Sequence, residues 1–267
     1  SNRALEIIRD VALEAPVGDG KELMNLVRGT ARRLAASRPS MASLTNKVSK
    51  LVYQIIQDER EVEELREDVA SMVRNLLNDY RRYKRASIEK AADYLRSFDT
   101  FITLSYSSTV LNVLDLTIPE KVIVGESRPL FEGRQLAKEL ANRGLGVTLV
   151  IDAAMVKFVE GADAAIVGAD SVLPDGSVIN KIGTKLLALA AEETLTPLYV
   201  ICDTSKFHVR SFLGEHPKLE EKDSSEVAEG IEGVDIRNPY FEITEGGYIS
   251  RIITENRAKK PQNLKEK

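Results

Sequence analysis

The sequence predicts an α/β protein in which a helical N-terminal part precedes a doubly wound, mainly parallel, Rossmann-like sheet. Two observations carry this prediction. Up to about residue 97 the apolar residues recur at steps of three and four, as they do along amphipathic helices. From Asp99 onward short β-rich runs alternate with segments of helical length, which is typical of strands joined by right-handed crossovers. We therefore expect a helical domain over residues 1–97 and a Rossmann-like domain over residues 98–267.

Three amphipathic stripes make up the helical part. The first covers residues 23–34 and ends before "SRPS" at 37–40, the second covers 41–55, and the third is a long stripe over 62–83. The third contains "NDYRRYKR" (78–85), which is basic and aromatic and could contact RNA. Its tyrosines fall on the apolar stripe, so a packed helix with a solvated basic face is the favoured interpretation.

Composition and charge limit the classes of function. The chain has 267 residues, of which 43% are hydrophobic and 29% charged, which suits one or two globular domains with an ample core. A net charge of −4 gives no basic field that would attract nucleic acid or a membrane surface. One cysteine, Cys202, and two histidines argue against a disulfide framework and against a zinc or histidine metal centre. With no membrane-length apolar run, signal peptide or dinucleotide-binding glycine motif, we expect a cytoplasmic protein without cofactor or metal.

Polar residues follow each predicted strand of the second part. Because the carboxyl ends of parallel strands meet at one edge of a sheet, these residues should converge there. Helix capping alone would account for the serines and aspartates, but not for Arg128 or Lys206. Two cations among carboxylates favour a ligand that carries phosphate. The strand ends are Ser105 after "FITL", Glu126–Ser127–Arg128 after "KVIVG", Asp152 after "GVTLVI", Asp170 after "AAIVGA", and Asp203 and Lys206 after "PLYVIC".

The densest polar stretch is "GADSVLPDGSVINKIGTKLLALAAEE", residues 168–193. A turn at Pro174–Gly176 predicts a helix that starts near Ser177 and buries Ile179, Ile182, Leu186 and Leu189. That helix would place polar side chains in its first turns, where free N–H groups and the helix dipole hold anions. We therefore predict phosphate-binding residues at Ser105, Ser107, Ser108, Arg128, Asn180, Lys181, Thr184 and Lys206.

Two motifs carry a resemblance to a known family. "VGADSVLPDGSVINKIGTKLLALAA" and "ESRPLFEGRQLAKEL", within residues 103–207, closely resemble the initiation factor 2B family. That family holds the α, β and δ regulatory subunits of the eukaryotic guanine-nucleotide exchange factor and their archaeal relatives. It also holds isomerases for ribose 1,5-bisphosphate and for methylthioribose 1-phosphate. The resemblance implies self-association through the α/β half, into at least a homodimer.

The resemblance also implies that the isomerases have a cysteine after the first strand, with the aspartate of the GAD motif as its partner. Here Ser105 stands in the place of the cysteine, and Asp170 is present. A thiol can be tuned toward proton transfer, whereas a serine hydroxyl is far less acidic and needs an adjacent base.

Three functions follow from this pattern. The missing cysteine favours a regulatory subunit that binds a phosphorylated metabolite or nucleotide without turnover and contacts translation initiation factor 2. The alternative is an aldose–ketose isomerase for a sugar phosphate, with Asp170 and Ser105 as catalytic residues and Lys181 in support. A structural paralogue with a vestigial pocket is the third.

Overall fold

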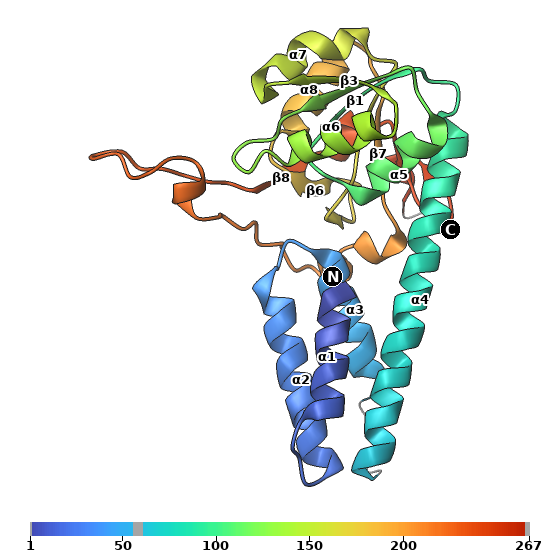
Figure 1. The fold of residues 1–267 in the computed structure, drawn as a ribbon, viewed down its shortest axis with the longest axis vertical. Helices are drawn as coiled ribbons and strands as arrows, with labels where there is room; N and C mark the ends of the chain where they lie inside the picture. Colours follow the sequence, from blue (N-terminus) through green and yellow to red (C-terminus); the bar gives the residue numbers. More distant parts are fainter. Residues whose placement is uncertain (1, 56–60, 265–267) are drawn as a thin grey trace.

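The helical part of the molecule is a four-helix bundle. The computed structural model describes residues 2–55 and 61–264. Helices α1 (Asn2–Glu14), α2 (Gly20–Ser37), α3 (Ala42–Gln54) and α4 (Val62–Leu95) stand side by side below the α/β part (Figure 1). Apolar side chains from all four helices form one buried core, which confirms the three predicted stripes.

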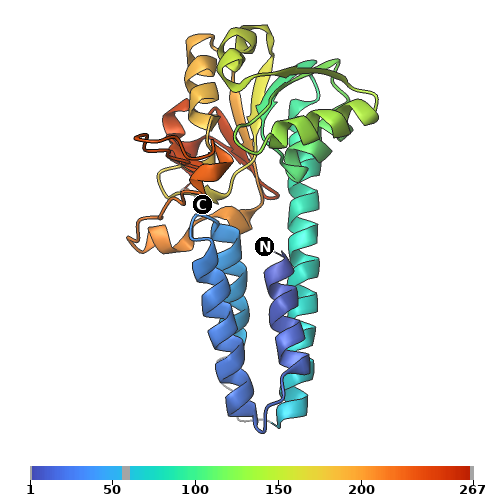
Figure 2. The same cartoon turned by 60° about the vertical axis from the view of Figure 1, so that its left-hand side comes forward.

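Helix α4 links the two parts of the molecule. It has 34 residues and is roughly 50 Å long at 1.5 Å per residue, and it runs from the far end of the bundle to the sheet (Figure 2). Its residues up to Tyr80 pack in the bundle core, whereas Ile88, Ala91 and Leu95 pack against the sheet. The helix therefore contributes side chains to both hydrophobic cores. The predicted domain boundary between residues 97 and 98 stays a prediction.

The second part is built on a seven-stranded sheet in the order β10-β9-β7-β4-β1-β2-β3. All neighbouring strands are parallel except β9 and β10, which confirms the doubly wound, mainly parallel sheet. The chain winds from β1 outward through β2 and β3, then returns to β4 on the other side of β1. The topological switch point thus lies between β1 and β4. The strands are β1 (Thr100–Leu104), β2 (Lys121–Gly125), β3 (Gly146–Val150), β4 (Ala164–Val167), β7 (Leu198–Ile201), β9 (Arg251–Ile253) and β10 (Ala258–Lys259).

Helices cover both faces of this sheet. The end of α4 with α5 (Ser108–Thr117) and α6 (Glu132–Asn142) packs on one face, and α7 (Met155–Phe158) with α8 (Thr184–Glu193) packs on the other. Phe101 and Ile102 are neighbours in β1 and enter opposite cores, because successive side chains of a strand point to opposite faces.

A small antiparallel sheet lies beside the main one, and here the sequence prediction is wrong. Strands β5 (Ser171–Val172), β6 (Val178–Lys181) and β8 (Phe241–Thr244) form it, so the predicted helix does not begin near Ser177. Val178 and Ile179 are β-branched residues that pair with β5 and β8, and α8 begins only after Gly183, whose φ is 98°. As a result Leu186 and Leu189 are exposed, and α8 buries Leu187, Ala188 and Ala191 instead.

Hydrogen bonds fix the start of α3 against the α/β part. The Asn46 side-chain amide donates to the backbone oxygens of Ser205 and Phe207, at 2.9 and 2.7 Å. The Ala42 N–H donates to Ser171 Oγ at 2.9 Å, and that hydroxyl donates to the Ser40 carbonyl at 2.6 Å. This end of the bundle is therefore held over the loops that follow β4 and β7.

A long and largely exposed segment, residues 213–237, joins α9 (Val209–Phe212) to β8, and part of it projects from the body of the molecule (Figure 1). Within residues 2–55 and 61–264, no helix is long and apolar enough to cross a membrane.

Candidate functional site

The loops after β1 and β4 meet at the switch point. Ser105 follows β1 with a φ of 61°, and its N–H donates to Ser127 Oγ at 2.6 Å. Ser107 caps α5, because its Oγ accepts from the Val110 N–H at 3.3 Å. Gly168 lies against this cap: a Cβ at position 168 would be 2.9 Å from Ser107 Oγ. The two loops therefore touch, and a glycine permits the close approach.

Asp170 is the carboxylate at this junction. Its N–H donates to the Ile179 carbonyl at 2.9 Å, which ties the loop to β6. Its Oδ1 lies 3.6 Å from Lys206 Nζ, and both side chains are about one-fifth exposed. Lys206 belongs to the 3₁₀ turn Thr204–Lys206 that follows β7. Two of the predicted site residues, from separate strand ends, thus form one ion pair.

Two adjoining cavities flank Asp170, and together they form the crevice. The smaller cavity has a volume of about 190 Å³ and the larger one about 490 Å³. Both are lined by Tyr106, Ser107, Gly168, Asp170 and Asn180. The smaller cavity is also lined by Ser105, Arg38 and Lys181, and the larger one by Ser108, Lys206, Lys47 and Lys84.

Lys181 reaches the smaller cavity from the end of β6. Its side chain is almost fully buried, its Nζ lies 3.1 Å from Glu132 Oε1, and it sits 3.5 Å from the centre of the Tyr240 ring. The Tyr240 hydroxyl donates to the same carboxylate oxygen. Burial lowers the pKa of Lys181, and the charge of Glu132 opposes that shift. A lysine held in this way keeps its ammonium close to the cavity wall.

The predicted anion seat at a helix start is wrong. Asn180 and Lys181 lie in a strand, and at the true N-terminus of α8 the Lys185 N–H already donates to Glu242 Oε1 at 2.9 Å. Thr184 is fully buried and lines neither cavity; its Oγ1 accepts from the Asn180 side chain at 3.0 Å and donates to the Lys181 carbonyl at 2.7 Å. Thr184 therefore holds the Asn180 side chain from outside the two cavities, and its assignment to phosphate binding stays a prediction.

Arg128 also lies outside the crevice. Its side chain donates to the Val227 carbonyl at 2.7 Å and stacks 5.0 Å from the Phe131 ring centre. Its backbone N–H and that of Ser127 donate to the two carboxylate oxygens of Asp152, each at 2.7 Å. The loop after β2 thus lies on the far side of β1 from the switch point, and its charges serve the loop itself.

Sequence reasoning missed two lysines of the helical part. Lys47 of α3 is 5% exposed; its Nζ donates to Asn2 Oδ1 at 2.9 Å and lies 4.4 Å from the Tyr80 ring centre. Burial lowers its pKa to about 8, against the raising effect of Asp203. The signal was present, because Lys47 interrupts the apolar stripe of Leu44, Val48 and Leu51.

Lys84 of α4 donates to Ser108 Oγ at 2.6 Å, and burial lowers its pKa. It belongs to "NDYRRYKR", for which the sequence favours a solvated basic face; that interpretation is wrong for Lys84. Tyr80 is buried in the bundle core and Tyr83 packs against it, as the stripe predicted.

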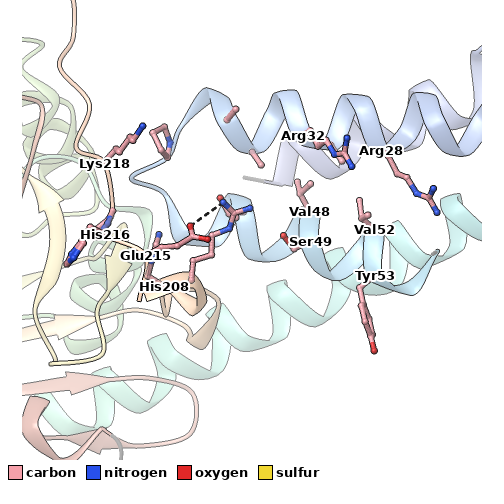
Figure 3. A pocket seen from close by; sticks show the side chains of 17 residues that line it. Arg28, Arg32, Val48, Ser49, Val52, Tyr53, His208, Glu215, His216 and Lys218 are labelled. Carbon is pink, nitrogen blue, oxygen red and sulfur yellow. Dashed lines mark ion pairs between the residues drawn. The ribbon is translucent and has the colours of Figure 1, made fainter. Parts of the chain in front are cut away.

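A third, more voluminous cavity lies elsewhere, between α2, α3 and residues 208–218 (Figure 3). It measures about 850 Å³ and is lined by Arg28 and Arg32 on one side and by Val48 and Val52 on the other. Its carboxylate, Glu215, is paired with Arg210 at 3.6 Å. None of the predicted site residues lines it. The crevice, which combines a carboxylate, hydroxyls and cations, is therefore the candidate site.

The chain matches known proteins along most of its length. The model of the Initiation factor 2 subunit family matches residues 1–261. Ribose 1,5-bisphosphate isomerase of Methanocaldococcus jannaschii is 32% identical, over 94% of this chain and 82% of that protein. The enzyme of the same name from Archaeoglobus fulgidus is 35% identical, over 88% and 77%. A putative translation initiation factor eIF-2B subunit 2-like protein of Pyrococcus furiosus is 36% identical, over 84% and 77%.

Solved structures agree with the fold. Translation initiation factor eIF-2B of Pyrococcus horikoshii OT3 superposes with a TM-score of 0.83 at 34% identity, over 97% of this chain and 90% of that one. 5-Methylthioribose 1-phosphate isomerase of the same organism gives a TM-score of 0.78 at 21% identity, over 98% and 79%. At that identity the second likeness concerns the fold alone.

These relatives overturn the function favoured from the sequence. The prediction of a regulatory subunit without turnover rests on the replacement of a cysteine by Ser105. Several archaeal relatives, including those at 32% and 35% identity, are ribose 1,5-bisphosphate isomerases, which supports the isomerase alternative instead. The physical weakness of the prediction is its dependence on one side chain, whereas the crevice retains Asp170, Lys206 and further cations.

Proposed function

Because the chain belongs to the Initiation factor 2 subunit family, we propose that it is a sugar-phosphate isomerase of the ribose 1,5-bisphosphate type, which converts an aldose phosphate to a ketose phosphate in the crevice. The observation that carries this proposal is the position of Asp170. Its carboxylate lies at the switch point, lines both cavities, and is held 3.6 Å from Lys206.

The reaction requires groups that move protons. In ribose 1,5-bisphosphate the phosphate on C1 closes the aldehyde into a ring acetal, so isomerisation breaks the bond between C1 and the ring oxygen. The ring oxygen and C1 each gain one hydrogen, C2 and its hydroxyl each lose one, and C2 becomes the ketone, so the formula is unchanged. When the hydrogen moves as a proton, one group accepts it from carbon and an acid supplies a proton at oxygen or at the neighbouring carbon. Within the described part of the chain, three carboxylates line the crevice: Glu132 is paired with Lys181, Asp203 lines only the larger cavity, and Asp170 lines both cavities. We therefore assign the acid–base role to Asp170, whose orientation the Lys206 ammonium fixes.

Ser105 contributes a hydroxyl to the smaller cavity beside Asp170. Its place is fixed by the positive φ and by the hydrogen bond from its N–H to Ser127. Because a serine hydroxyl is a weak acid, its role is to donate a hydrogen bond to a developing oxyanion of the sugar, while Asp170 carries the proton.

Cations around Asp170 suit a phosphorylated sugar. Arg38 and Lys181 line the smaller cavity, and Lys206 lines the larger one. Arginine and lysine are the side chains that hold phosphate oxygens by charge-assisted hydrogen bonds. Ser107, Ser108 and Asn180 add neutral donors at the same place.

Self-association is also part of the proposal. Strand β3 is an edge of the main sheet, and Leu149 and Ile151 at its end are 46% and 61% exposed. An exposed apolar sheet edge is a surface that a second copy can cover. Sedimentation should give a mass of at least twice 29.6 kDa at micromolar concentration, and Leu149→Glu should shift it toward the monomer. Contact with translation initiation factor 2 stays a prediction from the family resemblance.

The test is conversion of ribose 1,5-bisphosphate followed by ³¹P NMR. The wild-type chain should produce the ketose bisphosphate, and Asp170→Asn should lower the rate about a thousandfold, within the range of a lost acid–base group. Asp115→Asn is the matched control, since Asp115 pairs with Arg143 on the surface and lines neither cavity. Absence of conversion by folded wild-type protein, or conversion that Asp170→Asn leaves intact, would contradict the proposal.

A further inference from the structure

We propose that Lys47 and Lys84 form a binding seat for a second phosphate in the larger cavity, so that the crevice selects sugars phosphorylated at both ends. The proposal rests on the proposed function, because it assigns the remaining phosphate of the same substrate. It gives the helical bundle a direct part in substrate selection.

The first support is the placement of the two lysines. They come from α3 and α4, and both line the larger cavity together with Lys206 of the sheet edge. Lys47 is held by Asn2 Oδ1 and by the Tyr80 ring, and Lys84 by Ser108 Oγ. These contacts hold the two ammonium groups in place, and the Ser108 hydroxyl is a neutral partner that leaves the positive charge of Lys84 for an anion.

The second support is a pair of buried hydroxyls in the same cavity. Ser43 Oγ and Ser205 Oγ are buried and have no hydrogen-bond partner within residues 2–55 and 61–264. Both residues line the larger cavity, Ser43 from α3 and Ser205 from the turn after β7. A buried hydroxyl without a hydrogen-bond partner is unfavourable. Phosphate oxygens accept hydrogen bonds from such groups, so a bound phosphate would satisfy both.

The third support is the charge balance of the wall. Asp170 and Asp203 are the carboxylates of the larger cavity, and the cations outnumber them. The charges of Lys84 and Lys206 lower the pKa of Lys47, in addition to the effect of burial, and Asp203 opposes them. The neighbouring lysines therefore disfavour the charged form of Lys47 in spite of Asp203, and a phosphate dianion would favour it. The cations lining the cavity are Arg3, Lys47, Arg81, Lys84 and Lys206.

The two cavities divide the substrate. Lys181 and Arg38 serve one phosphate in the smaller cavity, the seat serves the other, and Asp170 lies on the wall that both cavities share. A sugar with one phosphate can fill only one of these positions. The helix that carries Lys47 is also fixed to the sheet edge, because Asn46 donates to the Ser205 and Phe207 carbonyls.

The experiment compares Lys47→Met and Lys84→Met with Lys50→Met and Lys90→Met. The controls lie on the same two helices and do not line the crevice; Lys50 is exposed, and Lys90 is half-buried and donates to the Asn256 carbonyl at 2.6 Å. The first readout is the ratio of kcat/KM for ribose 1,5-bisphosphate to that for ribose 1-phosphate. Each seat variant should lower this ratio at least tenfold, and each control should stay within twofold of wild type. Thermal unfolding verifies that the compared proteins are folded.

The second readout is equilibrium binding of inorganic pyrophosphate, which needs no turnover. Wild type should bind it, and the double variant should bind it at least tenfold more weakly. If turnover depends on neither lysine, or if the double variant still binds pyrophosphate, the proposed seat is wrong and the proposed isomerase function is unaffected. Lysine-dependent pyrophosphate binding without turnover of any sugar phosphate would support the seat and contradict the proposed isomerase.

Discussion

The loop after β2 and the loops at the switch point carry the same residue types, yet they differ in what these residues contact. Beside β2, both oxygens of Asp152 accept backbone N–H groups, and Arg128 donates to a backbone carbonyl. At the switch point, Asp170 and Lys206 form a loose pair whose charges face the crevice. The comparison teaches that residue type at a strand end does not by itself indicate a ligand site: the polar groups beside β2 are bound to their own loop, and those at the switch point line a crevice.

The largest effect that separates the two regions concerns stability. Asp152→Ala leaves two backbone N–H groups without their carboxylate, which should lower the free energy of unfolding by about 3 kcal/mol. For a chain of this size that corresponds to a fall in Tm of roughly 6–12 °C. Asp170→Asn should change Tm by less than about 2 °C, since within residues 2–55 and 61–264 the Asp170 side chain accepts no backbone N–H group. Equal losses of Tm in calorimetry would mean that Asp170 is structural as well.

The hydroxyls of Ser105 and Ser127 separate the two regions in turnover. Ser105→Ala removes a donor inside the smaller cavity and should lower kcat about tenfold, because one hydrogen bond to a developing charge is worth about 1–2 kcal/mol. The effect should fall on kcat and leave KM within twofold. Ser127→Ala, which removes the acceptor of the Ser105 N–H, should instead lower Tm. Steady-state kinetics beside thermal unfolding of both variants checks the contrast.

The pH dependence of binding reports on the larger cavity. Lys47 has a pKa lowered to about 8 by burial, so its ammonium is charged below that pH and loses its proton above it. Phosphate affinity should therefore weaken as pH rises through 8, by up to about tenfold per pH unit beyond it. Pyrophosphate titrations at pH 7 and pH 9 measure this difference. In Lys47→Met the difference should largely disappear; a profile that persists unchanged would assign the titration to another group.

The smallest effect is expected at Thr184. Thr184→Val keeps the shape but removes the hydroxyl that accepts from Asn180 and donates to the Lys181 carbonyl. We expect KM to rise about threefold and stability to fall by about 1 kcal/mol, because Asn180 loses its anchor. A change of kcat by a hundredfold would instead place Thr184 among the groups that contact the substrate.

Local sequence signals were enough for the main sheet and for part of the site. The five apolar runs from Phe101 to Ile201 are strands in the expected order, and the residues that follow β1, β4 and β7 line one crevice. The secondary structure around Val178 could not be predicted from neighbouring residues, because the apolar residues there fit both a helical and a strand period. The region forms a strand because it pairs with β8, which is distant in the sequence.

Local patterns gave only a partial signal for the contribution of the helical part: Lys47 interrupts an apolar stripe, but nothing in the pattern connects it to the sheet. Lys47 lines the crevice because the Asn46 side chain fixes α3 to the turn after β7. Lys84 lines it because α4 packs in the bundle core and then against the sheet. Periodicity assigns each lysine to a helix face but does not say which distant surface that face meets. Arg128 shows the converse: its residue type suggested phosphate, and the topology placed it outside the crevice.

The most direct test of the central claim is a crystal structure of the Asp170→Asn variant soaked with ribose 1,5-bisphosphate. We expect the sugar to bind in the crevice. Its C1, its C2 or an oxygen bonded to one of them should lie within about 3.2 Å of the side chain of residue 170. One phosphate should contact Lys181 and the other should contact Lys47 and Lys84. A sugar bound in the cavity between α2 and α3, with the crevice empty, would contradict the account.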